Sequence, residues 1–169
     1  GIGAAEQLHG KDLSYNNLVD LDAAWQLVAE FTHPAAVIVK HTNACGVATA
    51  SSIREAYLKA YQADTTSAFG GVLASNKAID LKAAEEINKL FFEILIAPGY
   101  EEEALALLKS KKNRILLQQK QDLRENKQFK SLLNGVIEQD LDLRTDARSD
   151  LKVVTKRAPS EQEVDALVF

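Results

Sequence analysis

A lysine and a histidine directly follow an apolar run in the segment "VIVKHTNACG". Lys40 supplies a cation with three hydrogen-bond donors, and His41 supplies an imidazole, the side chain that most often serves as an acid or base in catalysis. This pair suits proton transfer, with His41 as base and Lys40 as acid or oxyanion partner. Successive strand residues face opposite sides of a sheet, so the pair can serve one site only if the strand ends and the chain turns. A solvated Lys40 and a packed His41 are the alternative interpretation.

The thiol of Cys45, four residues after His41, adds two possibilities: a nucleophile or one ligand of a metal. Zinc sites need three or four ligands, and zinc-dependent nucleobase deaminases carry the patterns H-x-E and P-C-x-x-C. Here Asn43 stands two positions after His41, and the sequence contains one cysteine. We therefore expect no metal at this segment and interpret Cys45 as a small packed residue.

Apolar runs rich in β-branched residues alternate with amphipathic stretches over the first 118 positions. They predict, in chain order, a helix at 18–31 and a strand at 35–39, then a helix at 51–64 and a strand at 68–75, then a helix at 80–91, a strand at 93–97, a helix at 98–112 and a strand at 114–118. The expected N-caps are Asp20 or Asp22 for the first helix, Ser52 for the second and Asp80 for the third.

This alternation predicts βαβ units with right-handed crossovers and a mainly parallel sheet, and therefore an α/β fold. Residues 35–39 are expected to form a central parallel strand. In open α/β sheets ligands bind outside the carboxyl ends of the strands, so three segments qualify by position: 40–46, 75–77 and 97–100. Gly70, in the entry to the second strand, adds a place where the backbone could approach a ligand closely.

The pattern changes after position 118, where the chain becomes polar and highly charged. We expect an α/β subdomain at 1–118 and an excursion or arm at 119–169. The runs at 135–143 and 151–157 predict edge strands, and Ser160 followed by Glu163 forms a capping-box pattern that starts a helix. That helix ends after about two turns. Together with the absence of methionine, this suggests an internal piece of a longer chain.

The composition limits the classes of partner. A formal net charge of −4 argues against nucleic acid as the main partner, because neutralising phosphates needs a basic face. No run reaches the roughly 18 apolar residues of a membrane span, so we expect no membrane partner. One cysteine fits a reducing compartment, and we expect a cytoplasmic protein.

Four long motifs follow one another in this chain: "LHGKDLSYNNLVDLDAAWQLV", "VIVKHTNACGVA", "SAFGGVLASN" and "ILIAPGYEEEALALL". In sequence, order and spacing they resemble the formyltransferase domain of a bifunctional purine-biosynthesis family. That family combines aminoimidazole carboxamide ribonucleotide (AICAR) formyltransferase with IMP cyclohydrolase. The resemblance covers most of residues 6–118, and "VVTKRAPSEQEVDALVF" is similar to the family's continuation.

The resemblance implies a cytidine-deaminase-like, three-layer αβα fold with a mainly parallel or mixed sheet and no zinc. It implies formyl transfer from the co-substrate 10-formyltetrahydrofolate to the 5-amino group of AICAR, followed in the parent enzyme by ring closure to IMP. The family's catalytic pair falls on Lys40 and His41, and its nucleotide-contacting positions fall on Asn17, Gly70 and Glu93. The family builds its site across a dimer interface, which implies a homodimer for the parent enzyme.

The resemblance also implies that part of the site lies outside this sequence. In the family an arginine–tyrosine motif precedes the matching region, while a further asparagine, most folate-binding residues and the cyclohydrolase domain lie elsewhere. We therefore expect a fragment that is inactive alone. Two alternatives are a non-catalytic nucleotide-binding or dimerisation module of the same fold, and an unrelated α/β nucleotide hydrolase that uses Cys45.

Overall fold

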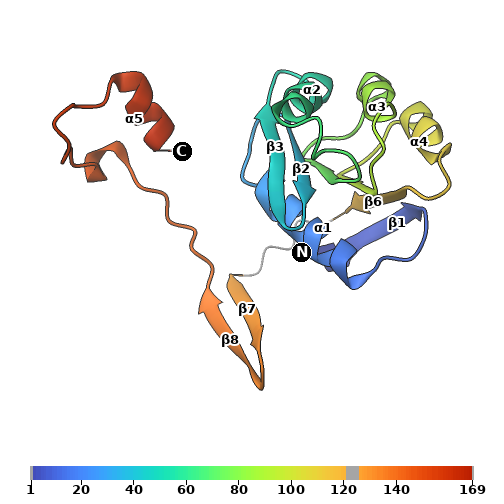
Figure 1. The fold of residues 1–169 in the computed structure, drawn as a ribbon, viewed down its shortest axis with the longest axis horizontal. Coiled ribbons are helices and arrows are strands. Elements are labelled where there is room, and N and C mark those ends of the chain that lie inside the picture. Colours follow the sequence, from blue (N-terminus) through green and yellow to red (C-terminus); the bar gives the residue numbers. More distant parts are fainter. Residues whose placement is uncertain (1, 121–125, 169) are drawn as a thin grey trace. The chain divides into compact units, whose positions relative to one another are not determined.

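The computed structural model describes residues 2–120 and 126–168, which fall into two units, Gly1–Leu123 and Arg124–Phe169 (Figure 1). The described elements of the first unit are η1 (Ile2–Ala4), β1 (Ala5–His9), α1 (Tyr15–Val28), β2 (Ala35–Lys40), β3 (Asn43–Thr49), α2 (Ile53–Ala63), β4 (Val72–Ser75), α3 (Leu81–Ile87), β5 (Ile94–Ala97), α4 (Glu102–Lys109) and β6 (Ile115–Gln119). Those of the second unit are β7 (Lys127–Leu132), β8 (Gly135–Asp140), η2 (Arg148–Asp150) and α5 (Glu161–Leu167).

A six-stranded sheet with the order β1-β6-β5-β4-β2-β3 lies at the centre of the first unit. β4, β5 and β6 run parallel to one another and are joined by α3 and α4, as the sequence predicts. The expectation for 35–39 is wrong, because β2 runs antiparallel to both β3 and β4. β1 pairs antiparallel with β6. The sheet is therefore mixed, and its parallel part consists of β4, β5 and β6.

Helices cover both faces of this sheet, which confirms the three-layer αβα architecture. Alternate strand residues enter two separate hydrophobic clusters. On one face, Leu21, Ala24 and Val28 of α1 pack with Val37 and Val39 of β2. On the other face lie α2, α3 and α4, side by side along the sheet (Figure 1).

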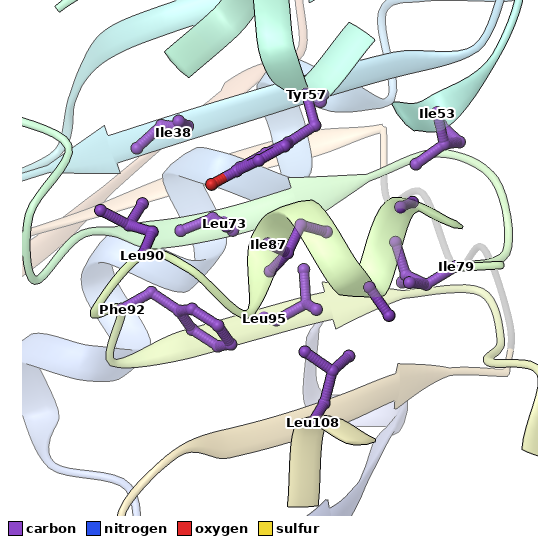
Figure 2. Close-up of a cluster of buried hydrophobic side chains, with 14 of the residues drawn as sticks. Ile38, Ile53, Tyr57, Leu73, Ile79, Ile87, Leu90, Phe92, Leu95 and Leu108 are labelled. Carbon is purple, nitrogen blue, oxygen red and sulfur yellow. The ribbon is translucent and has the colours of Figure 1, made fainter. Parts of the chain in front are cut away.

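The cluster under α2, α3 and α4 is the larger of the two. Tyr57 of α2, Ile87 of α3 and Leu108 of α4 lie over Leu73 and Leu95 of the sheet (Figure 2). A fully buried side chain of this size contributes about 1.5–3 kcal/mol through removal of apolar surface from water. This packed cluster therefore holds the strands in position, and with them the loops at their ends.

Helix α1 begins three residues earlier than expected. It starts at Tyr15, and its N-cap is Ser14 rather than Asp20 or Asp22. The Ser14 hydroxyl accepts from the Asn17 backbone N–H, and the Asn17 side chain accepts from the Ser14 N–H. Asparagine thus takes the place that glutamate or glutamine usually holds in a capping box. This frees the two aspartates for other contacts.

The expected caps of the next two helices are confirmed. Ser52 accepts from the backbone N–H of Glu55 at the start of α2, and Asp80 accepts from that of Ala83 at the start of α3. Both side chains satisfy backbone donors that the first helical turn leaves without a partner.

The sequence does not predict the two edge strands, β1 and β3. Both are partly exposed and lack a continuous apolar run, so nothing in their composition marks them as strands. β3 lies against α2 so closely that a Cβ on Gly46 would be 2.0 Å from the carbonyl oxygen of Ala60. Only glycine fits at this contact.

The second unit contains a two-stranded antiparallel hairpin of β7 and β8. β8 shortens the strand expected at 135–143, and its partner is β7 rather than the main sheet. The expectation for 151–157 is wrong: these residues are irregular. A strand needs a partner for its backbone groups, and none of the described strands pairs with residues 151–157. The side chain of Arg157 forms an ion pair with Glu163 at the start of α5. α5 begins after Ser160 with the expected capping box.

Candidate active site

The end of β2 and the beginnings of β4 and β5 lie next to one another along one edge of the main sheet. This is an edge at which strands begin or end, not one formed by an outer strand. Val39 of β2 pairs with Val72 of β4, and Val72 pairs with Ile94 of β5. Because β2 runs opposite to β4 and β5, it ends where they begin. Lys40, at the end of β2, and Glu93, just before β5, therefore lie at the same edge.

The Lys40 ammonium binds the turn that leads into β4. Its Nζ donates to the carbonyl oxygen of Phe69 at 2.8 Å, and the residue is half-buried. Gly70 follows with a φ of 74°, a conformation that glycine adopts without steric cost. Its N–H donates to the carbonyl oxygen of Phe91 at 2.8 Å. The Phe69 and Phe91 rings, both more than half exposed, have centroids 5.0 Å apart.

Asn17 and Glu93 join α1 to the same edge. The Asn17 side-chain amide donates to a Glu93 carboxylate oxygen at 3.1 Å, although the two residues are 76 positions apart. The backbone N–H of Glu93 donates to the carbonyl oxygen of Gly71 at 3.0 Å. Asn17 is buried and Glu93 half-buried. The pair is therefore held in place by the helix cap on one side and by the sheet on the other.

His41 occupies the two-residue turn between β2 and β3. Lys40 pairs with Asn43 across this turn, and His41 and Thr42 have φ values of 52° and 63°. Lys40 and His41 can face one site only if the strand ends between them, and this condition is met, because β2 ends at Lys40 and the chain turns at the next residue. His41 is exposed. The Thr42 N–H donates to Asp20 of α1 at 2.7 Å.

The structure thus brings the elements that carry all five predicted residues to one edge. Lys40, Gly70, Glu93 and Asn17 are linked through contacts with the chain around β4 and β5, and His41 is next to Lys40 in the chain. A cation, an imidazole, a carboxylate, an amide and two exposed aromatic rings are available there. Such groups can bind a polar heteroaromatic ligand and transfer protons.

The two other segments that qualified by position are at the opposite edge. Residues 75–77 and 97–100 follow the carboxyl ends of β4 and β5, whereas Lys40 stands at their amino ends. Asn76 binds the backbone around the start of β2 through three hydrogen bonds. The Tyr100 hydroxyl lies 3.0 Å from backbone carbonyl oxygens of β5 and β6. These groups stabilise loops. The three segments that qualified by position do not lie together, because β2 runs opposite to β4 and β5.

Cys45 packs against the larger hydrophobic cluster, as the sequence interpretation holds. It is half-buried, and its thiol lies 3.5 Å from the carbonyl oxygen of Ile38. Burial raises the pKa of this thiol, which lowers the fraction of reactive thiolate at neutral pH. The described residues contain no group of three or more histidine, cysteine or acidic side chains that could hold a metal ion, and no helix long and apolar enough to cross a membrane.

Sequence reasoning misses two features of this edge. One is the exposed pair of Phe69 and Phe91. Their rings meet because the loops that carry them lead into β4 and β5, which are neighbouring strands of the sheet. The other is Asp20, expected as a helix cap but bound to the β2–β3 turn. A usable signal exists for the second: a two-residue turn of histidine and threonine lacks the glycine or asparagine that such turns favour.

The fold and the polar edge together define a three-layer α/β domain with a candidate small-molecule site. The chain belongs to the AICARFT/IMPCHase bienzyme family, whose model matches residues 1–169.

Relatives named bifunctional purine biosynthesis protein PurH match nearly the whole chain. The protein of Chlorobium phaeobacteroides (strain BS1) is 54% identical over 96% of the chain. That of Thermoanaerobacter sp. (strain X514) is 50% identical over 100%, and that of Bacillus subtilis (strain 168) is 49% identical over 98%. The chain spans about a third of their length, 32% of the first and 33% of the other two.

Proposed function

We propose that the complete protein acts in purine biosynthesis by transferring a formyl group from 10-formyltetrahydrofolate to the 5-amino group of AICAR. The observation that carries the proposal is the meeting of the Lys40–His41 turn with Asn17, Gly70 and Glu93 at one sheet edge. Family membership and the name shared by the relatives supply the reaction class.

The nucleophile of this reaction is weak, because the amine lies on an aromatic ring beside an electron-withdrawing carboxamide. As the amine attacks the formyl carbon, it must lose a proton, and the exposed His41 imidazole is the group that we assign as base. The Lys40 ammonium stabilises the developing oxyanion or gives a proton to the departing folate nitrogen. Acyl transfer of this kind needs proton transfer and charge stabilisation but no metal.

The remaining groups bind and orient the nucleotide. We assign Asn17, Glu93 and the Gly70 turn to its polar parts, because their amide, carboxylate and backbone groups offer both donors and acceptors beside Lys40. The exposed rings of Phe69 and Phe91 offer an apolar surface on which a flat heteroaromatic ring can pack.

The proposal includes the assembly and location that the resemblance implies. The complete protein would be a cytoplasmic homodimer with a cytidine-deaminase-like formyltransferase domain, and a separate domain would close the ring to IMP. This chain alone would not turn over. Light scattering on the complete protein tests the dimer, since a monomeric mass at working concentration would contradict it.

The catalytic assignment is tested with Lys40→Ala and His41→Ala in the complete protein. We expect each to lower the kcat of formyl transfer by at least about a hundredfold, which corresponds to about 2.7 kcal/mol of transition-state stabilisation. A variant within about threefold of wild type would remove that residue from the mechanism.

Cys45→Ala separates this proposal from hydrolysis by a cysteine nucleophile. Because the thiol is packed and its pKa is raised, we expect formyl transfer to stay within about threefold of wild type. Complete loss of activity in Cys45→Ala would favour the hydrolase.

A binding measurement separates the proposal from the third alternative. If calorimetry shows that the wild-type protein binds AICAR but assays show no formyl transfer, the protein is a non-catalytic nucleotide-binding module.

A further inference from the structure

The turn that carries His41 is conformationally unfavourable for its sequence. Two-residue hairpin turns of type I′ have positive φ at both central residues and therefore favour asparagine followed by glycine. His41 and Thr42 have φ values of 52° and 63° without being either. A β-branched residue such as threonine is an outlier in this region, and residues held there cost about 1–3 kcal/mol each. The local sequence therefore does not by itself select this turn.

Three hydrogen bonds hold the turn. The Thr42 hydroxyl donates to the carbonyl oxygen of His41 at 2.6 Å, and the Asn43 side-chain amide donates to the same oxygen at 2.8 Å. Both of these bonds are local to the hairpin. The third comes from another element: the backbone N–H of Thr42 donates to the Asp20 carboxylate at 2.7 Å. A charged acceptor makes this bond stronger than a neutral one of the same geometry.

Helix α1 gives Asp20 a fixed position. The neighbouring Leu21 is buried against the sheet, and it belongs to the same cluster as Ala24 further along the helix. Asn17 lies three residues before Asp20, so both project from one side of α1. Asn17 binds Glu93 and Asp20 binds the turn. One helix face therefore holds the two halves of the candidate site.

We propose that Asp20 is a positioning residue for formyl transfer. By accepting from the Thr42 N–H, it selects the positive-φ turn and so places the His41 imidazole beside Lys40 for proton transfer. The inference rests on the proposed function and adds to it a residue that itself touches neither substrate.

The first test compares Asp20→Ala with Asp20→Asn in the complete protein. Alanine removes the acceptor, so we expect kcat to fall by at least about tenfold while the KM for AICAR stays within about threefold. Asparagine keeps an oxygen acceptor, so kcat should stay within about threefold of wild type. Asp22→Ala is the matched control: Asp22 is on the same helix and accepts from Gln26, not from the turn.

The second test adds Thr42→Gly to Asp20→Ala. Glycine adopts positive φ freely, so the turn should form again without Asp20, and kcat should recover by at least about fivefold. Hydrogen exchange at the amide of residue 42 reports on the turn directly. Protection should fall in Asp20→Ala and persist in Asp20→Asn.

Three results would overturn the inference: Asp20→Ala within about twofold of wild-type kcat, Asp20→Asn as slow as Asp20→Ala, or no recovery with Thr42→Gly. If Asp20→Ala does not fold, Asp20→Ser replaces it, since serine keeps a polar group but is too short to reach the amide. If the complete wild-type protein shows no formyl-transfer activity, the proposed function is refuted instead. In that case amide exchange at Thr42 alone decides whether Asp20 holds the turn, and unchanged protection in Asp20→Ala refutes it.

Discussion

Lys40 and His41 are held in place by different physical means, although they are neighbours in the chain. Strand pairing fixes the backbone of Lys40, and the Phe69 carbonyl oxygen fixes its ammonium. His41 lies outside the ladder, in a turn with positive φ that depends on a contact from α1. At the residue scale, the ammonium therefore depends on the sheet, and the imidazole depends on a helix-to-turn hydrogen bond.

Close packing next to the turn gives a prediction at the same scale. In Gly46→Ala the new Cβ would lie 2.0 Å from the Ala60 carbonyl oxygen, so β3 and α2 must move apart. We expect the free energy of unfolding to fall by about 1–3 kcal/mol, measured by urea denaturation.

Gly3→Ala is the matched control, because a Cβ there would meet nothing within 4 Å. Its unfolding free energy should stay within about 0.5 kcal/mol of wild type. An equal effect of the two substitutions would show that the contact between β3 and α2 is looser than the structure has it.

At the element scale, the direction of β2 decides where the candidate site lies. A parallel β2 would have ended beside residues 75–77, at the carboxyl ends of β4 and β5. The antiparallel β2 ends beside Gly70 and Glu93, where Asn17 of α1 reaches Glu93 and Asp20 of the same helix reaches the β2–β3 turn. The candidate site is therefore assembled from one helix, one hairpin turn and two strand entries.

Helix α5 gives a pH-dependent prediction. The pKa of Glu163 is lowered to about 2. The largest cause is the hydrogen bond from the Arg157 guanidinium, and the hydrogen bonds with Ser160 contribute less. A carboxyl group with a lowered pKa contributes stability above its unfolded pKa of about 4.3, and that contribution disappears as the pH falls through the folded value. We expect the helical NMR signals of α5 to weaken as the pH is lowered from about 4.3 towards 2.

Titration of the Glu163 carboxyl carbon by NMR measures the same effect directly. Arg157→Gln should raise the midpoint, because it removes the largest cause of the shift. Arg144→Gln, which removes an arginine with no part in that shift, should leave the midpoint where it is. A wild-type midpoint in the ordinary range for glutamate would contradict the prediction.

At the scale of the whole molecule, the core belongs to one unit. Every described residue that is buried lies between Asn17 and Gln119, and no described residue of Arg124–Phe169 is buried. An isolated two-stranded hairpin has marginal stability in water, because it cannot bury enough apolar surface. The second unit therefore has little to stabilise it by itself.

Expressed separately, residues 1–123 should unfold cooperatively, whereas residues 124–169 should show no cooperative transition. Circular dichroism on heating measures both, and amide exchange shows which backbone groups are protected. Cooperative melting of the separate 124–169 segment would contradict the prediction, as would loss of fold in 1–123.

The sequence by itself determined the local features of this protein. Apolar runs marked β2, β4, β5 and β6, because strands buried on both faces are nearly continuous in apolar residues. Ser52, Asp80 and Ser160 marked three helix starts, because a cap acts within one helical turn. Four long motifs in order, one of them around Lys40 and His41, indicated the family, and the family model confirms that assignment.

Only the tertiary structure decided the direction of β2, the pairing of the edge strands and the contacts that assemble the candidate site. Asn17 meets Glu93 across 76 positions, and Asp20 meets Thr42 across 22. Such pairs depend on how helices and strands pack, and periodicity or capping within a short window contains no information about them. A strand has the same apolar pattern in either direction, so its orientation follows from the partners that it finds in the folded sheet.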